Sequence, residues 1–145
     1  MMLNAIDNLS QVETLALTIY GEGRGESIEG QVAIACVIRN RSSKQTIKEI
    51  CLAPFQFSCW NKNDPNYPVL MEFVDQLIIG SKVSDIHLRQ CIWVAQGIIS
   101  GDILDNTGAA KYYLTNALIK SGKFPSWANN RNNEHVIDNQ TFFNV

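Results

Sequence analysis

Two glutamates, Glu22 and Glu26, lie among three glycines directly after an amphipathic helical pattern. A carboxylate at the end of a buried helix can be held rigidly and partly desolvated, and desolvation raises a carboxyl pKa. The negative end of the helix dipole acts in the same direction. A carboxyl group that stays protonated near neutral pH can serve as a general acid. We therefore predict Glu22 as the catalytic acid and Glu26 as the second candidate catalytic carboxylate.

A purely structural interpretation of this segment stays open. Glu22 could pair with Arg24 or Arg39, and Glu26 could simply begin the next helix. Arg24 could equally hold the loop or contact a substrate. Glycines on both sides of Glu22 favour the catalytic interpretation, because glycine suits close backbone approach better than a regular helix interior.

A second group of residues mixes aromatic rings with amides, which is typical of saccharide sites. Rings stack on sugar C–H faces while amides bind hydroxyl and N-acetyl groups. The competing interpretation is that these aromatics are core residues, above all Phe57 and Tyr113; Trp60 and Trp127 lie in polar, irregular segments and suit a cleft. With Arg24, the candidate substrate-binding residues are Gln56, Ser58, Trp60, Asn61, Tyr112, Tyr113 and Trp127.

Cys59 raises a rival hypothesis. Its neighbours Ser58 and Trp60, with His135 and Asn139 far downstream, have the order of a papain-like cysteine peptidase, and an amidase could use the same pair. The papain-like nucleophile, however, opens a long helix that lowers its pKa. Residues 61–65 here include asparagines and a proline, which will not form one.

The hydrophobic periodicity predicts an α+β fold that is mostly α-helical, with a small β element, and residues 1–145 as a single domain. A capping box at Ser10 opens the first helix, which we expect to break at Gly21, and Ser27 caps a buried central helix ending near Asn40. An irregular aromatic and polar loop occupies residues 53–68. The other expected elements are a short helix from Thr46, helices over 69–80 and 85–100, and strands over 110–114 and 141–143, with an irregular segment between the two strands.

The composition and charge of the chain exclude several classes of function. The chain has 145 residues and a net charge of −2, which gives no basic surface for nucleic acid. No N-terminal signal peptide and no apolar run long enough to span a membrane are visible, so we expect synthesis in the cytoplasm and no membrane insertion. Four cysteines without CxxC spacing predict buried free thiols and no metal site. We expect no cofactor.

Residues 19–26, followed by residues 29–41, resemble the cell wall hydrolase family of spore cortex-lytic enzymes, including its phage and gene-transfer-agent members. Residues 56–61 and 64–66 resemble the middle block of the phage-type members, and residues 110–113, 125–127 and 137–143 resemble their C-terminal blocks. The resemblance implies a lysozyme-like, lytic-transglycosylase-like fold that acts on peptidoglycan. It also implies one catalytic glutamate, which falls on Glu22.

This resemblance implies cleavage between N-acetylmuramic acid and N-acetylglucosamine, with Glu22 protonating the glycosidic oxygen. In a lytic transglycosylase the same glutamate then closes a 1,6-anhydro ring, and Glu26 supports the loop. In a true hydrolase Glu26 would be the second carboxylate. We expect a monomeric, endolysin-like enzyme that reaches the wall through a holin, a virion or host lysis. The chain departs from the family at Asp138 and Gln140, where glycine and histidine are usual, and an inactive wall-binding virion component stays an alternative.

Overall fold

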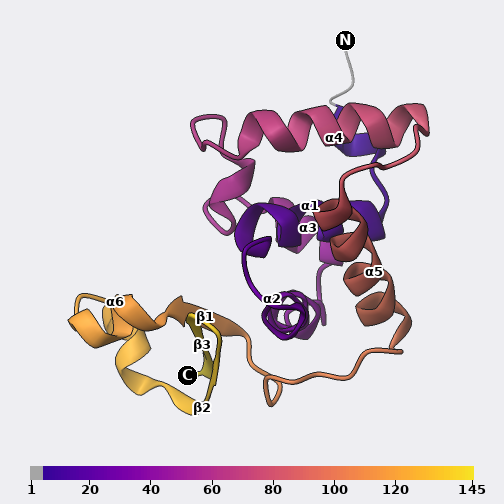
Figure 1. Cartoon of the computed structure of the whole chain (residues 1–145). Coiled ribbons are helices and arrows are strands. Elements are labelled where there is room, and N and C mark those ends of the chain that lie inside the picture. The colour runs from indigo at the N-terminus through magenta and orange to yellow at the C-terminus, as the bar shows by residue number, and fades with distance from the viewer. Residues whose placement is uncertain (1–4) are drawn as a thin grey trace.

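The structure is a computed structural model that describes residues 5–145. Residues 1–4, part of the N-terminal segment without a visible signal, lie outside this range. A helical body formed by α1 to α5 makes up most of the molecule, and a smaller unit with a sheet and α6 lies at its lower left in Figure 1. The N-terminal residues that come first in the described chain form a 3-10 helix, Ala5–Asn8.

Two helices form the centre of the body. In α1 (Gln11–Gly23) every residue from Thr14 to Tyr20 is buried, and in α2 (Ile28–Asn40) every residue from Gly30 to Ile38 is buried. Ser10 caps α1 in a complete capping box, and the Ser27 hydroxyl accepts from the Gly30 amide to cap α2. Helices that are apolar on all sides belong in a core, and the other helices pack around this pair.

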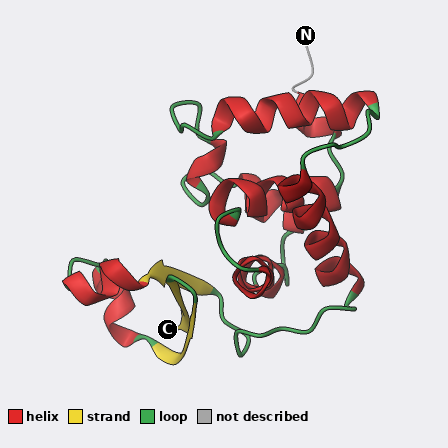
Figure 2. Ribbon diagram, viewed as in Figure 1, coloured by secondary structure: helices red, strands yellow, loops and turns green. Residues whose placement is uncertain are grey.

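Three further helices enclose α1. The most extensive contact of α1 is with α5 (Ile86–Ser100), and α3 (Ile47–Leu52) and α4 (Tyr67–Ile79) pack against its other sides. In Figure 2 α4 crosses the top of the body and α5 descends along its right side. Between α3 and α4 the chain makes a loop with one 3-10 turn, Ser58–Trp60, which touches α1.

The sheet has three antiparallel strands in the order β1-β3-β2, namely β1 (Tyr112–Thr115), β2 (Asn132–Ile137) and β3 (Gln140–Asn144). Tyr112 pairs with Phe143 and Tyr113 pairs with Phe142. Both phenylalanines are fully buried, so the two faces of β3 are both covered. β1 and β2 contact α2, which fixes the sheet against the body. A short helix, α6 (Asn116–Ser121), and a 3-10 helix, Ser126–Asn130, lie between β1 and β2.

Side-chain hydrogen bonds join the two parts at both ends of α2. At its C-terminal end the Asn40 amide donates to Asp105 Oδ2 and to the Ala110 carbonyl, both at 2.9 Å, which anchors the segment entering β1. At its N-terminal end Asp138, in the β2–β3 turn, accepts from Ser27. The sheet is therefore held against α2 at two points.

The structure confirms the α+β fold, mostly helical with a small sheet, and corrects two details. The first helix does not break at Gly21 but continues to Gly23. The segment predicted to be irregular contains α6 and β2. β2 escaped prediction because it is polar and largely exposed, with a bulge between Asn132 and His135, so it lacks the alternation that marks a half-buried strand.

The four cysteines are all free and buried, as predicted. Over residues 5–145, no helix combines the length and apolar content that crossing a bilayer requires. The same residues contain no cluster of three or more His, Cys, Asp or Glu side chains that could hold a metal ion.

Candidate active site

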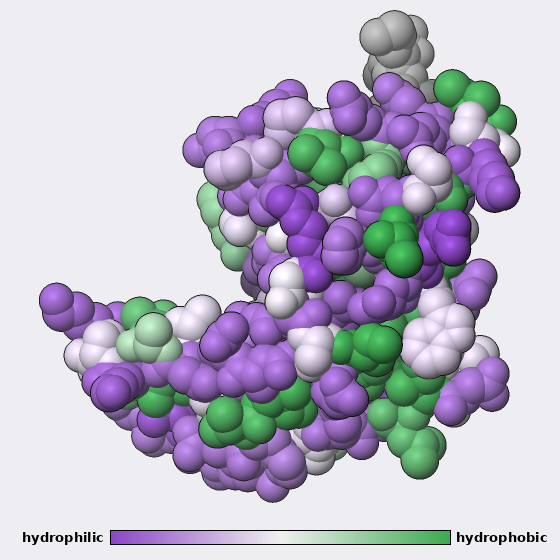
Figure 3. Space-filling view, in the orientation of Figure 1, coloured by the Kyte–Doolittle hydropathy of each residue, from purple (hydrophilic) through white to green (hydrophobic). Residues whose placement is uncertain are grey.

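Glu22 lies in the last turn of α1, where the helical body faces the sheet. One cavity beside it, of about 300 Å³, is lined by residues 21–26 together with Asn66 and Asn139. A second, of about 260 Å³, is lined by Glu22 with Tyr113, Gln140 and neighbouring residues of β1 and α6. Figure 3 shows the molecular surface hollowed between the body and the smaller unit. Glu22 is the residue common to both cavities.

The Glu22 carboxyl has the electrostatic environment of a general acid. Burial, and then the nearby charge of Asp64, raise its pKa from 4.5 to about 7. The Asp64 side chain also accepts a hydrogen bond from the backbone N–H of Asn66. The side chain of Asn66 in turn donates from Nδ2 to the Gly21 carbonyl at 3.3 Å. The loop before α4 is thus tied to the turn that carries Glu22, and it brings a second carboxylate near it.

Close packing explains why a glycine stands at position 21 inside the helix. A Cβ atom on Gly21 would lie 2.5 Å from Cys59 Cβ and 2.7 Å from Cys59 Sγ, closer than atoms can approach. The glycine therefore serves close packing of α1 against the loop rather than ending the helix, which corrects the predicted break.

Glu22 does not form the ion pair with an arginine that the purely structural interpretation requires. Within the described residues the one ion pair joins Arg131 and Glu134, so Glu22 pairs with neither Arg24 nor Arg39. The Arg24 guanidinium instead lies over the Tyr20 ring, 4.9 Å from its centroid. Glu26 lines the same cavity as Glu22.

The predicted saccharide residues divide into three groups. Tyr113 lies beside Glu22, where burial raises the pKa of its phenol and the Glu22 charge raises it further. Tyr112, on the neighbouring position of β1, stacks with Trp127 at 5.2 Å between ring centroids and lines a third cavity together with Gln56. Ser58 and Asn61 are exposed at the two ends of the 3-10 turn and line none of these three cavities.

Trp60 lines a cavity of its own, away from Glu22, together with residues that include Lys62 and Tyr67. Its indole N–H donates to Thr18 Oγ1 at 2.9 Å, and its ring packs against the hydrophobic core. A partly buried tryptophan needs a partner for its N–H group, and Thr18 on α1 provides it. Trp60 thus fastens the loop to α1 and lines none of the three cavities around Glu22 and β1.

Sequence reasoning did not select several residues that line the cavities next to Glu22. Asn66, Asn139 and Gln140 all do so, and Asp64 acts on Glu22 electrostatically. Gln140 Oε1 is buried and has no hydrogen-bond partner within residues 5–145. A polar atom in this state at a cavity wall is open to a ligand or water. The departure from the family pattern at Gln140 was the one signal in the sequence.

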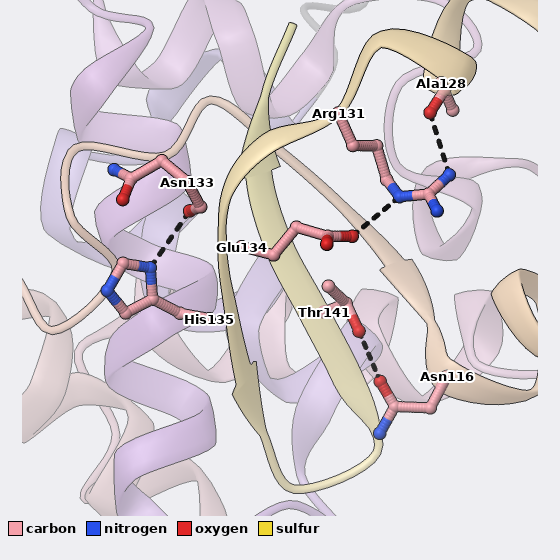
Figure 4. Close-up of polar contacts among 7 residues, drawn as sticks. All are labelled: Asn116, Ala128, Arg131, Asn133, Glu134, His135 and Thr141. Carbon is pink, nitrogen blue, oxygen red and sulfur yellow. Dashed lines mark hydrogen bonds and ion pairs between the residues drawn. The ribbon is translucent and has the colours of Figure 1, made fainter.

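The cysteine hypothesis fails on the burial of its nucleophile. Cys59 is fully buried, and burial raises the pKa of its thiol well above the ordinary value, which is the opposite of activation. Its proposed base, His135, lies on β2 and interacts through Nδ1 with the Asn133 carbonyl (Figure 4). Figure 4 also shows the contacts that hold this hairpin, between Arg131 and Glu134 and between Thr141 and Asn116.

The fold is that of the SleB catalytic domains from two Bacillus species. The catalytic domain of the germination-specific lytic transglycosylase SleB from Bacillus anthracis matches with a TM-score of 0.62 and 24% identity, over 95% of this chain and 98% of that one. The catalytic domain of the Bacillus cereus SleB protein matches with a TM-score of 0.63 and 22% identity, over 99% of this chain and 98% of that one.

The family follows from the sequence. The model of the cell wall hydrolase family matches residues 25–143, and the chain belongs to that family. No curated protein matches significantly. Glu22 precedes the matched segment by three residues, so its assignment rests on the geometry and electrostatics above.

Proposed function

We propose that this protein cleaves peptidoglycan glycan strands between N-acetylmuramic acid and N-acetylglucosamine as a lytic transglycosylase, with Glu22 as acid and then base. The observation that carries the proposal is the Glu22 carboxyl itself. Its pKa of about 7, raised by burial and by Asp64, leaves much of it protonated at neutral pH, and the residue lies where two cavities meet. Family membership and the name of the B. anthracis neighbour support the same reaction.

The reaction needs only one catalytic carboxyl group. Glu22 donates its proton to the glycosidic oxygen as the bond from that oxygen to muramic acid C1 breaks, and positive charge develops at C1. The resulting Glu22 carboxylate then takes the proton of the muramic 6-hydroxyl while O6 bonds to C1. The products are a 1,6-anhydromuramic end and a free N-acetylglucosamine end, and Glu22 is protonated again. No water is consumed.

Glu26 supports the loop in this proposal. Its backbone N–H donates to the Gly23 carbonyl at 3.0 Å, and it directly precedes Ser27, the N-cap of α2, which suits a residue that positions the loop. It also lines the Glu22 cavity, so a hydrolytic outcome would make it the second carboxylate. We further propose that the enzyme reaches the wall through a holin, a virion or host lysis.

The test is digestion of purified peptidoglycan by the wild type and by Glu22→Gln, with products identified by mass spectrometry. Anhydromuropeptides from the wild type alone are expected. Reducing-end muropeptides would show that the enzyme is a hydrolase and not a transglycosylase. Cut peptides on intact glycan would favour a peptidase or amidase, and binding without cleavage would favour a wall-binding component. Melting curves of both proteins verify that Glu22→Gln is folded.

A further inference from the structure

A third cavity, of about 360 Å³, lies next to the candidate active site. It is lined by Tyr112 of β1, by Lys111 just before it, and by side chains from the end of α2, from α3 and from the segments beside α3: Arg41, Gln45, Ile50, Ala53 and Gln56. Tyr113, the next residue of β1, lines the second Glu22 cavity. Burial raises the pKa of its phenol, the Glu22 carboxylate raises it further, and the Arg41 guanidinium lowers it. Arg41, in the wall of the third cavity, and Glu22 therefore both lie near the Tyr113 phenol.

Arg41 is held rigidly in the wall of this cavity. Its Nε donates to the Lys111 carbonyl at 2.6 Å and its Nη1 donates to Gln56 Oε1 at 2.8 Å. Its guanidinium lies over the Tyr112 ring, 5.3 Å from the centroid. Three contacts thus fix its orientation before any ligand arrives, which lowers the entropy cost of binding.

The positive charge of Arg41 has no acidic partner. The side chain is half-buried, yet the one ion pair within residues 5–145 is that of Arg131 and Glu134. Burial lowers the pKa of Arg41, but an arginine remains protonated at neutral pH. Lys111 adds a second positive charge to the same cavity. A partly desolvated cation without a counter-ion is unfavourable unless an anion completes the site.

We infer that this cavity is a subsite for the stem peptide of peptidoglycan, with Arg41 and Lys111 binding a stem-peptide carboxylate. The inference rests on the proposed glycan cleavage, since it places a muramoyl unit at Glu22. Guanidinium groups match carboxylates in geometry and charge. The cavity is far larger than one carboxylate, and the Gln45 and Gln56 amides can bond peptide groups. The enzyme therefore prefers glycan that carries its peptides.

The experiment compares peptide-bearing glycan strands with strands stripped of their peptides by an amidase, which keep only the lactyl carboxylate. Arg41→Gln should raise KM on peptide-bearing strands about tenfold, the effect of losing a charge-assisted hydrogen bond. Its kcat should stay within about twofold, and its kinetics on stripped strands should match those of the wild type. Lys111→Gln, an exposed position that carries no fold risk, should raise the same KM about threefold. Lys82→Gln, an exposed charge in the turn before α5, is the matched control.

Two results would overturn the inference. If Arg41→Gln raised KM equally on both substrates, Arg41 would bind the lactyl carboxylate or hold Gln56 and Lys111 in place. If it raised KM on neither substrate, Arg41 would not contribute to substrate binding. Added salt gives a readout that a structural role would not move, because it should weaken the wild-type preference for peptide-bearing strands, and it should weaken that of Arg41→Gln less, since only Lys111 remains.

Failure of the proposed cleavage is distinguishable from failure of the subsite. If the wild type cuts neither substrate, sedimentation with insoluble peptidoglycan still measures whether Arg41→Gln and Lys111→Gln weaken binding. Weaker binding of both variants to peptide-bearing material alone would support the subsite, and unchanged binding would overturn it.

Discussion

Gly21 of α1 packs so closely on Cys59 that any side chain at position 21 would overlap the cysteine Cβ and Sγ. This contact lies one residue before Glu22, so the packing of a loop on a helix sets the position of the candidate acid. We expect Gly21→Ala to destabilise the protein by about 1–3 kcal/mol, the usual cost of overpacking. Chemical denaturation measures this. Gly25→Ala is the control, because a Cβ at Gly25 meets no atom within 4 Å.

The raised pKa of Glu22 makes stability depend on pH. A carboxyl group whose pKa is about 7 in the folded protein and 4.5 otherwise binds more protons when folded, so its contribution falls as pH rises from about 4.5 to 7. Glu22→Gln should therefore stabilise the protein by about 1–2 kcal/mol at pH 8, after allowance for partial exposure, and should change little at pH 4. Urea titrations at both pH values test this. A gain of equal size at both would contradict the shifted pKa.

Asp64 provides a second test of the same electrostatics, this time on activity. The acid must be protonated, so kcat/KM should fall above the pKa of Glu22, about 7. Asp64→Asn removes the negative charge that helps to raise this pKa, and the alkaline limb of the pH profile should move to lower pH. Asp75→Asn, an exposed carboxylate on α4, should leave the limb unmoved. An unmoved limb in Asp64→Asn as well would show that burial alone sets the pKa.

Much of the helical fold was predictable, because capping residues and apolar periodicity are local signals. Ser10, Ser27 and Thr46 cap helices as predicted, and α2 is buried along its length. Glu22 could be predicted as the acid because glycines flank it at a helix end. The packing role of Gly21 could not be predicted, because it depends on a contact with Cys59, 38 positions away in the sequence.

The same limit explains why several candidate site residues were not predicted from the sequence. Asp64, Asn139 and Gln140 reach Glu22 only through tertiary structure, and their local residue pattern does not predict that proximity. Trp60 was assigned to a cleft because its neighbours are polar; it does line a cavity, but its N–H bond to Thr18 on α1 could not be read from those neighbours. Local composition predicts where a segment is irregular and cannot predict which way one side chain points.

Asp138 holds the β2–β3 turn against the start of α2. Its Oδ2 accepts from the Ser27 backbone N–H at 2.9 Å and from Ser27 Oγ at 2.6 Å, and these bonds lower its pKa. Asp138→Ala should loosen the wall of the Glu22 cavity that Asn139 forms and lower kcat/KM by about tenfold. Steady-state kinetics measure the loss, with the exposed Asp102→Ala as control. Unchanged kinetics would mean that the turn needs no such tether.

The thiols give a prediction that separates the glycan and peptide reactions. Burial raises the pKa of Cys36 to about 11 and those of Cys51 and Cys91 to about 12, and Cys59 is raised further. Iodoacetamide should therefore leave the native enzyme active, and mass spectrometry should find alkylation only after denaturation. Rapid inactivation with modification of Cys59 would restore the cysteine hypothesis.

The β2–β3 turn also carries an evolutionary consequence. Asp138 has a φ of 51°, a conformation that glycine adopts freely, and its carboxylate occupies the space that a Cβ on Gly30 would need. The two positions are therefore coupled. Alanine at position 30 would require the Asp138 carboxylate to move away from Ser27, and its Cβ would still lie 3.0 Å from the Glu26 Cβ atom. Glycine in the turn would remove the first contact and leave the second, so both the turn and the segment before α2 favour glycine at position 30.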